Sequence, residues 1–188
     1  QKGYILKTQA NPGFLEIVEG SIFDHKLVEK LFTNADLCVN LIGILFEKGK
    51  NNFNNIHVEF PKMISRYAST YKLIKFVHLS ALGIEDAKDS IYAQSKLKGE
   101  KEILDNFKRT VIVRPSIVYS VDDNFTTQLM TLLGLLPFFP IYYKGKTKFR
   151  PIYCSDLTDS ITKIITDDIR ESIIEFVGPE ELTFKEIL

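Results

Sequence analysis

The feature that most constrains the fold is a regular alternation of short apolar runs with longer stretches of helical periodicity. Apolar runs at residues 37–42, 75–79 and 110–114 have the length of strands. Their almost unbroken apolar character is typical of parallel strands that are covered on both faces. Amphipathic helical patterns separate them, at residues 56–68 and 90–106. This order predicts an α/β fold with a doubly wound parallel sheet, in which residues 37–42 form a central strand.

Weaker signals predict shorter elements before and after this alternation. Asn11-Pro12-Gly13 indicates a turn, and Gly145 marks another. Asp24 is expected to cap a helix, and Thr183-x-x-Glu186 has the pattern of a capping box. The remaining predicted elements are a strand at 15–18, a helix at 125–136, a strand at 151–154, a helix capped by Ser155 or Asp156, and a strand at 173–177.

The balance of charges excludes one class of partner. The 188 residues hold 24 Lys and Arg against 24 Asp and Glu, whereas a nucleic-acid-binding protein usually carries a basic excess. The three histidines are isolated and the two cysteines, Cys38 and Cys154, lie far apart, so we predict no metal site. We interpret both cysteines as reduced, buried thiols of an intracellular protein.

One apolar run, Leu132 to Tyr143, has three interpretations. Pro137 and Pro140 interrupt it, and it is shorter than the roughly 18 residues of a spanning helix, so no membrane span is predicted. It can be core, a lid over a substrate crevice, or an exposed patch that docks a partner or a membrane surface. The basic cluster at residues 144–150 is either a solvated loop or a site for a phosphate-bearing ligand or anionic lipid.

Three polar side chains form a candidate catalytic set. Tyr92 and Lys96 are four residues apart on a predicted helix, so they share one face. A phenol beside a fixed ammonium is expected to ionise more easily. Ser80 ends the strand before this helix, and the three groups together can relay a proton to or from a carbonyl or alcohol. The alternative is a chance pair on an exposed helix face, with Ser80 bonding a turn.

The ordered set of Ser80, Tyr92-x-x-x-Lys96 and Arg114-Pro115 resembles the short-chain dehydrogenase/reductase superfamily, of the extended or atypical kind. The resemblance covers the chain from Glu16 to Glu186. Four stretches indicate a narrower group within this superfamily: residues 40–47, 76–83, 92–100 and 146–153. They resemble the NAD-dependent epimerase/dehydratase group that includes the NAD(P)H-binding accessory subunit of respiratory complex I and its alphaproteobacterial relatives. The resemblance implies a Rossmann-type fold that binds a dinucleotide, NAD or NADP, reduced or oxidised.

The resemblance also implies a role for individual residues. Tyr92 matches the acid/base tyrosine, Lys96 the lysine that binds the nicotinamide ribose and lowers the pKa of the tyrosine, and Ser80 the hydroxyl that orients a substrate carbonyl. The implied cofactor-binding residues are Ser21 and Ile22 beside adenine, Asn40, Leu41, Ile42 and Gly43 along the adenosine ribose and pyrophosphate, and Pro115, Ser116 and Val118 at the carboxamide, together with Tyr92 and Lys96.

Three residues depart from the group's pattern. Ser21 replaces an aspartate that usually contacts adenine, and Ser120 replaces a glycine. His57 stands where an asparagine often begins the long helix, and we interpret it as a structural substitution; we interpret His78 as a packed core histidine.

The Gly-rich turn that usually cradles the pyrophosphate is absent from the sequence. We therefore expect the opening βα unit to lie upstream of Gln1, and the helix that starts at Thr183 to continue past Leu188. Residues 1–120 are expected to form an N-terminally incomplete NAD(P)-binding Rossmann-like domain. Residues 121–188 are expected to form a small, C-terminally incomplete substrate-side lobe with return elements.

Two functions remain open from the sequence. The leading hypothesis is a dinucleotide-binding protein of the complex I accessory-subunit type, which holds its cofactor for structure or sensing. Its partners would be respiratory-chain subunits, with peripheral membrane association, on the matrix side of mitochondria or in the cytoplasm of a bacterium. The second is a free-standing oxidoreductase or nucleotide-sugar epimerase/dehydratase that uses Ser80, Tyr92 and Lys96. A redox-sensing regulator without catalysis is a weaker third hypothesis, since such proteins often lose the tyrosine.

Overall fold

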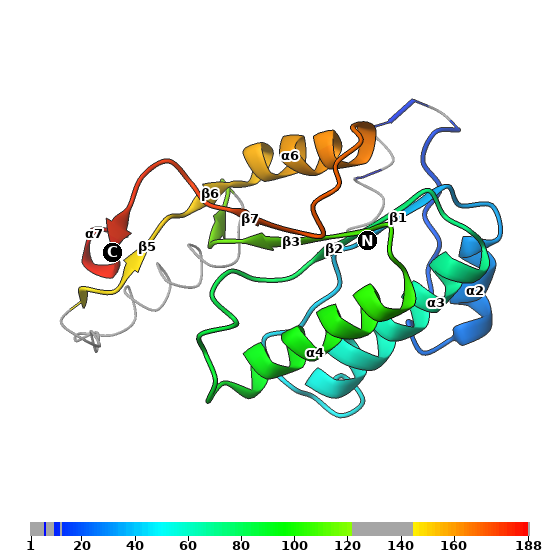
Figure 1. The fold of residues 1–188 in the computed structure, drawn as a ribbon, viewed down its shortest axis with the longest axis horizontal. Coiled ribbons are helices and arrows are strands. Elements are labelled where there is room, and N and C mark those ends of the chain that lie inside the picture. Colours follow the sequence, from blue (N-terminus) through cyan, green and yellow to red (C-terminus); the bar gives the residue numbers. More distant parts are fainter. Residues whose placement is uncertain (1–5, 7–9, 12, 122–144, 188) are drawn as a thin grey trace. The chain divides into compact units, whose positions relative to one another are not determined.

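The computed structural model describes residue 6, residues 10–11, 13–121 and 145–187 (Figure 1). The chain separates into two compact units, Gln1–Asn34 and Ala35–Leu188, and each is described by itself. The predicted helix at 125–136 and the apolar run from Leu132 to Tyr143 lie outside the described residues. Among the described residues, no helix is both long enough and apolar enough to cross a membrane.

The smaller unit contains the helix α2, His25–Phe32. As predicted, Asp24 caps it, because an Asp24 side-chain oxygen accepts from the Leu27 N–H at 3.1 Å. The predicted turn is also present, with a hydrogen bond from the Phe14 N–H to the Asn11 carbonyl at 3.1 Å. The strand predicted at 15–18 is wrong. A strand needs a hydrogen-bonded neighbour, and this segment pairs with no described residue.

The larger unit is built on four parallel strands in the order β1-β2-β3-β7. The strands are β1 (Leu37–Asn40), β2 (Lys75–Leu79), β3 (Thr110–Pro115) and β7 (Ile173–Phe176). Val39 lies beside Val77, and Val77 beside Val111, so one face of the sheet is a continuous β-branched surface. The predicted parallel α/β sheet is confirmed. Among the described strands β1 pairs with β2, and the central position predicted for residues 37–42 stays a prediction.

Helices cover both faces of this sheet (Figure 1). One face carries the π-helix η1 (Asn54–Glu59), which runs into α3 (Phe60–Thr70), and α4 (Ile91–Asn106). Pro61 falls in the first turn of α3, where η1 and α3 join. The other face carries α6 (Cys154–Thr166), whose Leu157 and Ile164 pack with Val77 and Val113. The layered arrangement is that of a doubly wound fold.

One glycine sets how closely α4 approaches the neighbouring helix. A Cβ placed on Gly99 would lie 1.8 Å from the carbonyl oxygen of His57. That distance is far inside van der Waals contact, so only glycine lets the backbone of α4 touch the backbone of η1. The contact fixes the register between α4, which carries Tyr92 and Lys96, and η1.

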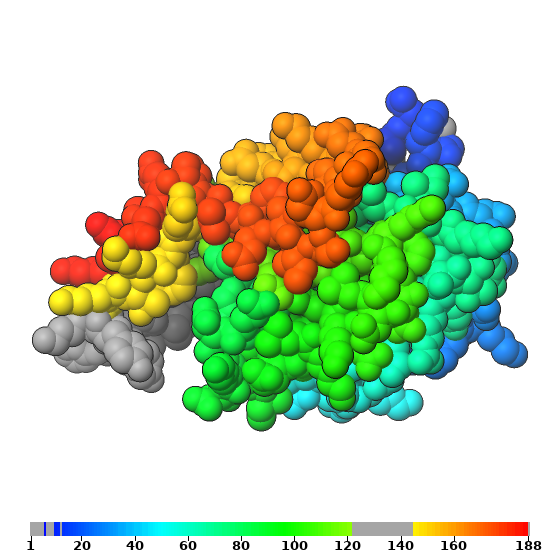
Figure 2. Space-filling model, viewed as in Figure 1, coloured from blue at the N-terminus to red at the C-terminus, as the bar shows by residue number. Residues whose placement is uncertain are grey.

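Four short strands and a short helix form a smaller group at one end of the unit, of which β5 and α7 are in yellow and red in Figure 2. Two short ladders organise it, β4 (Val118–Tyr119) with β6 (Ile152–Tyr153), and β5 (Lys148–Phe149) with β8 (Leu182–Thr183). The helix α7, Phe184–Ile187, follows β8. Gly145 has φ +69°, in the left-handed region that glycine favours, and the turn predicted around it reaches into residues outside the described ranges.

Of the caps predicted for the two late helices, one is present and one is not. The capping box is confirmed, because Glu186 accepts from the Thr183 N–H at 2.7 Å and the Thr183 hydroxyl accepts from the Glu186 N–H at 3.3 Å. The cap predicted for α6 is wrong. Strand β6 runs directly into this helix, so Tyr153 is its N-cap without a side-chain hydrogen bond. Asp156 lies in the first turn instead, where a negative charge is favourable.

We expect Gly99→Ala to lower the free energy of unfolding by about 3 kcal/mol or more, because the added methyl group forces α4 away from η1. Denaturant unfolding measures this loss. Lys98→Ala is the matched control, since Lys98 is exposed on the same helix and its replacement should change stability by less than about 0.5 kcal/mol. Equal effects of the two substitutions would contradict the close helix contact.

Candidate functional site

Helix α4 delivers Lys96 to the carboxyl end of the sheet. Ser90 starts this helix, and its hydroxyl accepts from the Ala93 N–H at 3.3 Å. One turn further on, the Lys96 Nζ donates to the carbonyl of Leu79, the last residue of β2, at 3.2 Å. Lys96 is only 5% exposed. Since Ser80 follows Leu79 directly, the structure brings the predicted lysine to the predicted serine.

Ser80 itself is held by its backbone, while its hydroxyl is unsatisfied. The Ser80 N–H donates to the Val113 carbonyl at 2.7 Å, which extends the β2–β3 ladder. The Ser80 Oγ is buried, and it is the one buried side-chain oxygen or nitrogen without a hydrogen-bond partner in the part of the chain that the structure describes. Buried hydroxyls are nearly always bonded, so this one marks a place where a ligand or water completes the site.

The loop after β1 lies over the Lys96 ammonium. A Cβ on Gly43 would lie 3.3 Å from Lys96 Nζ, so a glycine here gives the backbone close access to the charge. The loop is anchored at Asn40, whose Oδ1 accepts from the Ile42 N–H at 3.1 Å and whose Nδ2 donates to His78 Nδ1 at 2.9 Å. His78 is confirmed as a buried core histidine. Burial, together with the Lys96 charge, lowers the pKa of His78 to about 3, so the ring is neutral.

His57 connects the same loop to α4, a role that the sequence analysis missed. Its Nε2 accepts from the Ile44 N–H at 3.1 Å, and its Nδ1 lies 2.8 Å from the Ser95 Oγ. The Ser95 hydroxyl donates to the Tyr92 carbonyl at 2.6 Å. The only sequence signal for this role was the histidine's place at the start of the long helix. Residues 40–44, His57, Tyr92 and Lys96 therefore come together.

Tyr92 differs from its predicted chemistry. The side chain is half-buried and packs edge-on against His57, with ring centroids 5.3 Å apart. Burial raises the pKa of Tyr92, the direction opposite to the one expected from a neighbouring ammonium. The expectation of an easily ionised phenol is therefore wrong here. Burial also disfavours the charged form of Lys96. It lowers the pKa of Lys96 to about 8, and Glu100 opposes this shift only in part.

A buried ion pair fixes the far part of α4. The Arg114 guanidinium donates to both Glu100 carboxylate oxygens, at 3.1 and 2.7 Å, and both residues are at least 95% buried. Arg114 also contacts Glu85 at 2.9 Å, in the loop that follows Ser80. The hydrogen bond to Glu100 is the main reason that the pKa of Arg114 lies above its ordinary value. The pair therefore ties α4, β3 and this loop together.

The remaining predicted cofactor-binding residues belong to strand ends, to the exposed part of the loop after β1 and to the smaller unit. The Pro115 carbonyl accepts from the Leu82 N–H at 2.9 Å, and the Ser116 N–H donates to the Phe176 carbonyl at 2.8 Å. Val118 belongs to β4, and Leu41 and Ile42 are exposed. Ser21 and Ile22 belong to the smaller unit. There the Ser21 Oγ accepts from the Phe23 N–H at 3.2 Å, so this side chain forms a turn before α2.

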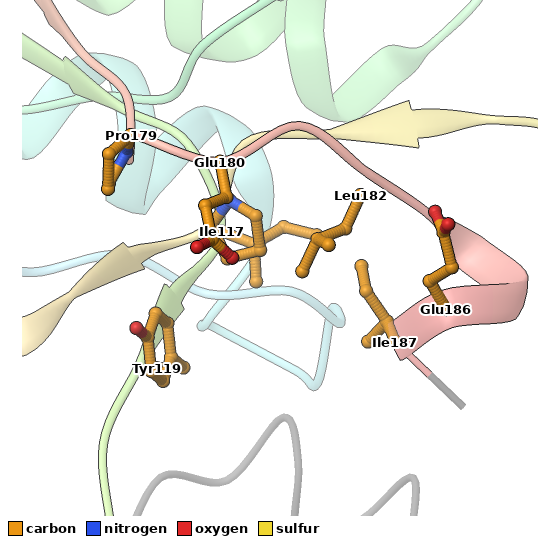
Figure 3. Close-up of a pocket in the computed structure, with 8 residues that line it drawn as sticks. Ile117, Tyr119, Pro179, Glu180, Leu182, Glu186 and Ile187 are labelled. Carbon is orange, nitrogen blue, oxygen red and sulfur yellow. The ribbon is translucent and has the colours of Figure 1, made fainter.

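A pocket that was not predicted from the sequence lies among the late elements (Figure 3). Its volume is about 450 Å³, which suits a small molecule. Apolar side chains dominate the lining, with the Tyr119 phenol and two carboxylates as polar groups. The described lining residues are Ile117, Tyr119, Pro151, Pro179, Glu180, Leu182, Glu186 and Ile187. Over the described ranges, no three His, Cys, Asp or Glu residues are grouped so as to hold a metal ion.

The fold is that of the short-chain dehydrogenase/reductases of the epimerase/dehydratase kind. Residues 45–177 match the model of the family described as the RmlD substrate binding domain, and the chain belongs to this family. The predicted resemblance to the epimerase/dehydratase group is thereby confirmed, while the roles of Ser80, Tyr92 and Lys96 stay predictions.

Curated relatives include subunits of mitochondrial NADH dehydrogenase. The chain is 27% identical over 184 residues to "NADH dehydrogenase (ubiquinone) 1 alpha subcomplex subunit 9, mitochondrial" of Dictyostelium discoideum, covering 97% of this chain and 51% of that protein. It is 23% identical over 183 residues to the "NADH-ubiquinone oxidoreductase 40 kDa subunit, mitochondrial" of Neurospora crassa, covering 97% and 48%. The chain thus spans about half the length of these relatives and is distantly related to them.

Solved structures share the fold at low identity. UDP-glucuronic acid 4-epimerase from Bacillus cereus, in complex with UDP-glucuronic acid and NAD, aligns with a TM-score of 0.76 and 19% identity, over 98% of this chain and 67% of that chain. The dTDP-glucose 4,6-dehydratase DesIV from Streptomyces venezuelae, with NAD bound, aligns with a TM-score of 0.75 and 18% identity, over 100% and 65%. These likenesses confirm the Rossmann-like fold.

We expect the buried Lys96 charge to make stability depend on pH. Its folded pKa of about 8 lies below the ordinary 10.5, so between these values the unfolded chain holds a proton that the folded protein has released. Stability contributed by this group therefore rises with pH, by about 1.4 kcal/mol from pH 7 to pH 9.

Denaturant unfolding at the two pH values tests this expectation. The difference in unfolding free energy between pH 9 and pH 7 should be larger in the wild type than in Lys96→Met by that amount. Lys98→Met, at an exposed position, should behave as the wild type. Identical pH profiles for wild type and Lys96→Met would show that Lys96 carries no depressed pKa.

Proposed function

We propose that the chain is part of a dinucleotide-binding protein of the complex I accessory-subunit type, with the nicotinamide end of the cofactor at Ser80, Tyr92 and Lys96. The observation that supports this most is the unpartnered Ser80 hydroxyl. It directly follows the residue whose carbonyl binds the Lys96 ammonium. A buried hydroxyl beside a buried cation can bind a polar ligand, and without such a partner both groups lower the stability of the protein.

The residues at this edge fit a dinucleotide. The Lys96 ammonium has three donors and donates to the Leu79 carbonyl, so further donors are available for ribose hydroxyls. The Asn40–Gly43 segment would follow the adenosine ribose and pyrophosphate, and Gly43 allows close approach of the backbone. Pro115, Ser116 and Val118 would lie at the carboxamide, and Ser21 and Ile22 near adenine. When bound, the nicotinamide ring accepts or gives a hydride.

A structural or sensing role fits the electrostatics of Tyr92. Its raised pKa keeps the phenol in its protonated form at neutral pH, so the side chain can donate a hydrogen bond, but the phenolate that would act as a base is not populated. The relatives named as NADH dehydrogenase subunits support the accessory-subunit type. The protein would then assemble with respiratory-chain subunits at the matrix side of a mitochondrial membrane, or at the cytoplasmic face of a bacterial one, by peripheral association.

A free-standing oxidoreductase or epimerase/dehydratase is the second candidate. The pocket of about 450 Å³ beside Tyr119 favours it, since that volume would hold a substrate. In this case Tyr92 would move a proton to or from a carbonyl or alcohol, while Ser80 and Lys96 orient the reacting groups. Retention of Tyr92 speaks for either candidate over a regulator without catalysis.

We expect Lys96→Met to weaken dinucleotide binding by about tenfold or more, because hydrogen bonds from a charged donor are lost. Tyr92→Phe should keep the affinity within about threefold, since it removes one neutral donor. Calorimetric titration of the full-length protein with NAD⁺, NADH, NADP⁺ and NADPH measures both effects. The controls are Lys98→Met, at an exposed position, and Tyr71→Phe, at the end of α3.

Turnover distinguishes the two candidates. Assays of NADH oxidation with carbonyl substrates and of UDP-sugar epimerisation should give no activity that depends on Tyr92 if the role is structural. Hydride transfer in the wild type that disappears in Tyr92→Phe would overturn the structural role and favour the enzyme. Failure of all four dinucleotides to bind would overturn both candidates.

A further inference from the structure

His57 occupies the junction between the loop after β1 and the helix that carries Tyr92 and Lys96. We propose that His57 is a positioning residue, which fixes the Leu41–Ile44 loop against α4 before the dinucleotide binds. This proposal rests on the proposed function for its consequence, whereas the bridge itself is a property of the protein without cofactor.

The direction of each hydrogen bond in the bridge is determined by its backbone partners. The Ile44 N–H can only donate, so His57 Nε2 is the unprotonated acceptor, at 3.1 Å. In a neutral ring the proton therefore resides on Nδ1, which donates to the Ser95 Oγ at 2.8 Å. The Ser95 hydroxyl then donates to the Tyr92 carbonyl at 2.6 Å. The chain of donors runs in one direction, from the loop to the first turn of α4.

The surroundings keep this ring neutral. His57 is 2% exposed, and the nearby Lys96 ammonium opposes a second positive charge. These effects lower the pKa of His57 to about 4, although the Glu47 carboxylate acts in the opposite direction. A protonated ring could not accept from the Ile44 N–H, so the bridge is intact at neutral pH.

Packing also fixes where the ring lies. Phe53 stacks on it with centroids 5.3 Å apart and planes 20° from parallel. The Tyr92 ring meets it edge-on at 5.3 Å and 87°. The carbonyl of His57 is held by the close approach of Gly99. Because the ring and its backbone are both confined, the position of Nε2, and with it the Ile44 N–H, is set by α4.

The loop is thereby anchored at two alternate residues. The Ile42 N–H is bound to Asn40, which is itself held by His78, and the Ile44 N–H is bound to His57. Gly43 lies between them, where an added Cβ would be 3.3 Å from Lys96 Nζ and 3.8 Å from His57 Nε2. A loop held in this way loses little freedom when it receives a ligand, which favours binding.

Two isosteric variants separate positioning from simple core filling. In His57→Gln the side-chain oxygen reaches the place of Nε2 and can still accept from the Ile44 N–H. In His57→Asn the shorter amide reaches only the place of Nδ1 and can still donate to Ser95. Both variants remove the aromatic ring, so loss of packing affects both. His25→Gln, at an exposed histidine, is the control.

Hydrogen exchange of the Ile44 amide and NAD⁺ calorimetry on the full-length protein measure the outcome. We expect His57→Asn to speed Ile44 exchange and to weaken NAD⁺ binding by about tenfold each, while His57→Gln stays within about threefold of wild type in both. Melting temperatures should fall by similar amounts in the two variants. If both variants lose affinity in proportion to melting temperature, with equal Ile44 exchange, the proposal is overturned.

Ser95→Ala provides a second route if the buried histidine variants fold poorly, since Ser95 is half-buried. It removes the partner of Nδ1, and we expect Ile44 exchange to rise and NAD⁺ affinity to fall by about threefold each; no change in exchange would contradict the bridge. A wild type that fails to bind NAD⁺ but shows the expected Ile44 exchange in the variants would refute the proposed function and leave the bridge standing.

Discussion

The buried ion pair between Glu100 and Arg114 holds the site together. Charges taken out of water are tolerated only when their partners and geometry are good, and here the guanidinium meets both oxygens of one carboxylate. Glu100 is one turn beyond Lys96 on α4, and Arg114 is on β3, so the pair fixes the helix to the sheet. The further contact to Glu85 extends this control to the loop after Ser80. The three side chains of the site thus lie on elements that share one anchor.

The site itself is built at a cost to stability. Lys96 is a buried ammonium with a lowered pKa, and Ser80 has a buried hydroxyl without a partner in the described residues. Neither contributes to a well-packed core, and both would be poor choices for stability alone. Their place at the carboxyl ends of parallel strands is where open α/β sheets bind ligands. The two neutral histidines, by contrast, support the loop rather than carry charge.

Sequence patterns predicted the parts of the fold that depend on local chemistry. Strands β2 and β3, the Asp24 cap and the Thr183 capping box follow from apolar periodicity and side-chain hydrogen bonding. The errors concern features that depend on other segments of the chain. Residues 15–18 have the composition of a strand but pair with no described residue, and α6 follows β6 directly, without the predicted cap.

In the candidate site too, local patterns predicted some features, while contacts between distant segments determine the others. The spacing of Tyr92 and Lys96 placed them on one helix face, and Ser80 at a strand end. The pKa of Tyr92 and the bridge through His57 depend on burial and on contacts between residues 38 positions apart, such as His57 and Ser95. No pattern in a single sequence reports such contacts. Gly99 carried no local signal either, since its role depends on the carbonyl of another helix.

The pairing of β7 with β3 has a consequence for how the larger unit assembles. Ile112 lies beside Ile173, so the fourth strand joins the sheet only after the chain has left it and returned. The pairings among β1, β2 and β3 and their connecting helices join segments that lie closer together along the chain. Closing a long connection is slow relative to local pairing. The half of the sheet that carries Ser80 and the Tyr92 helix is therefore expected to form first during folding, with β7 docking onto it as a late event.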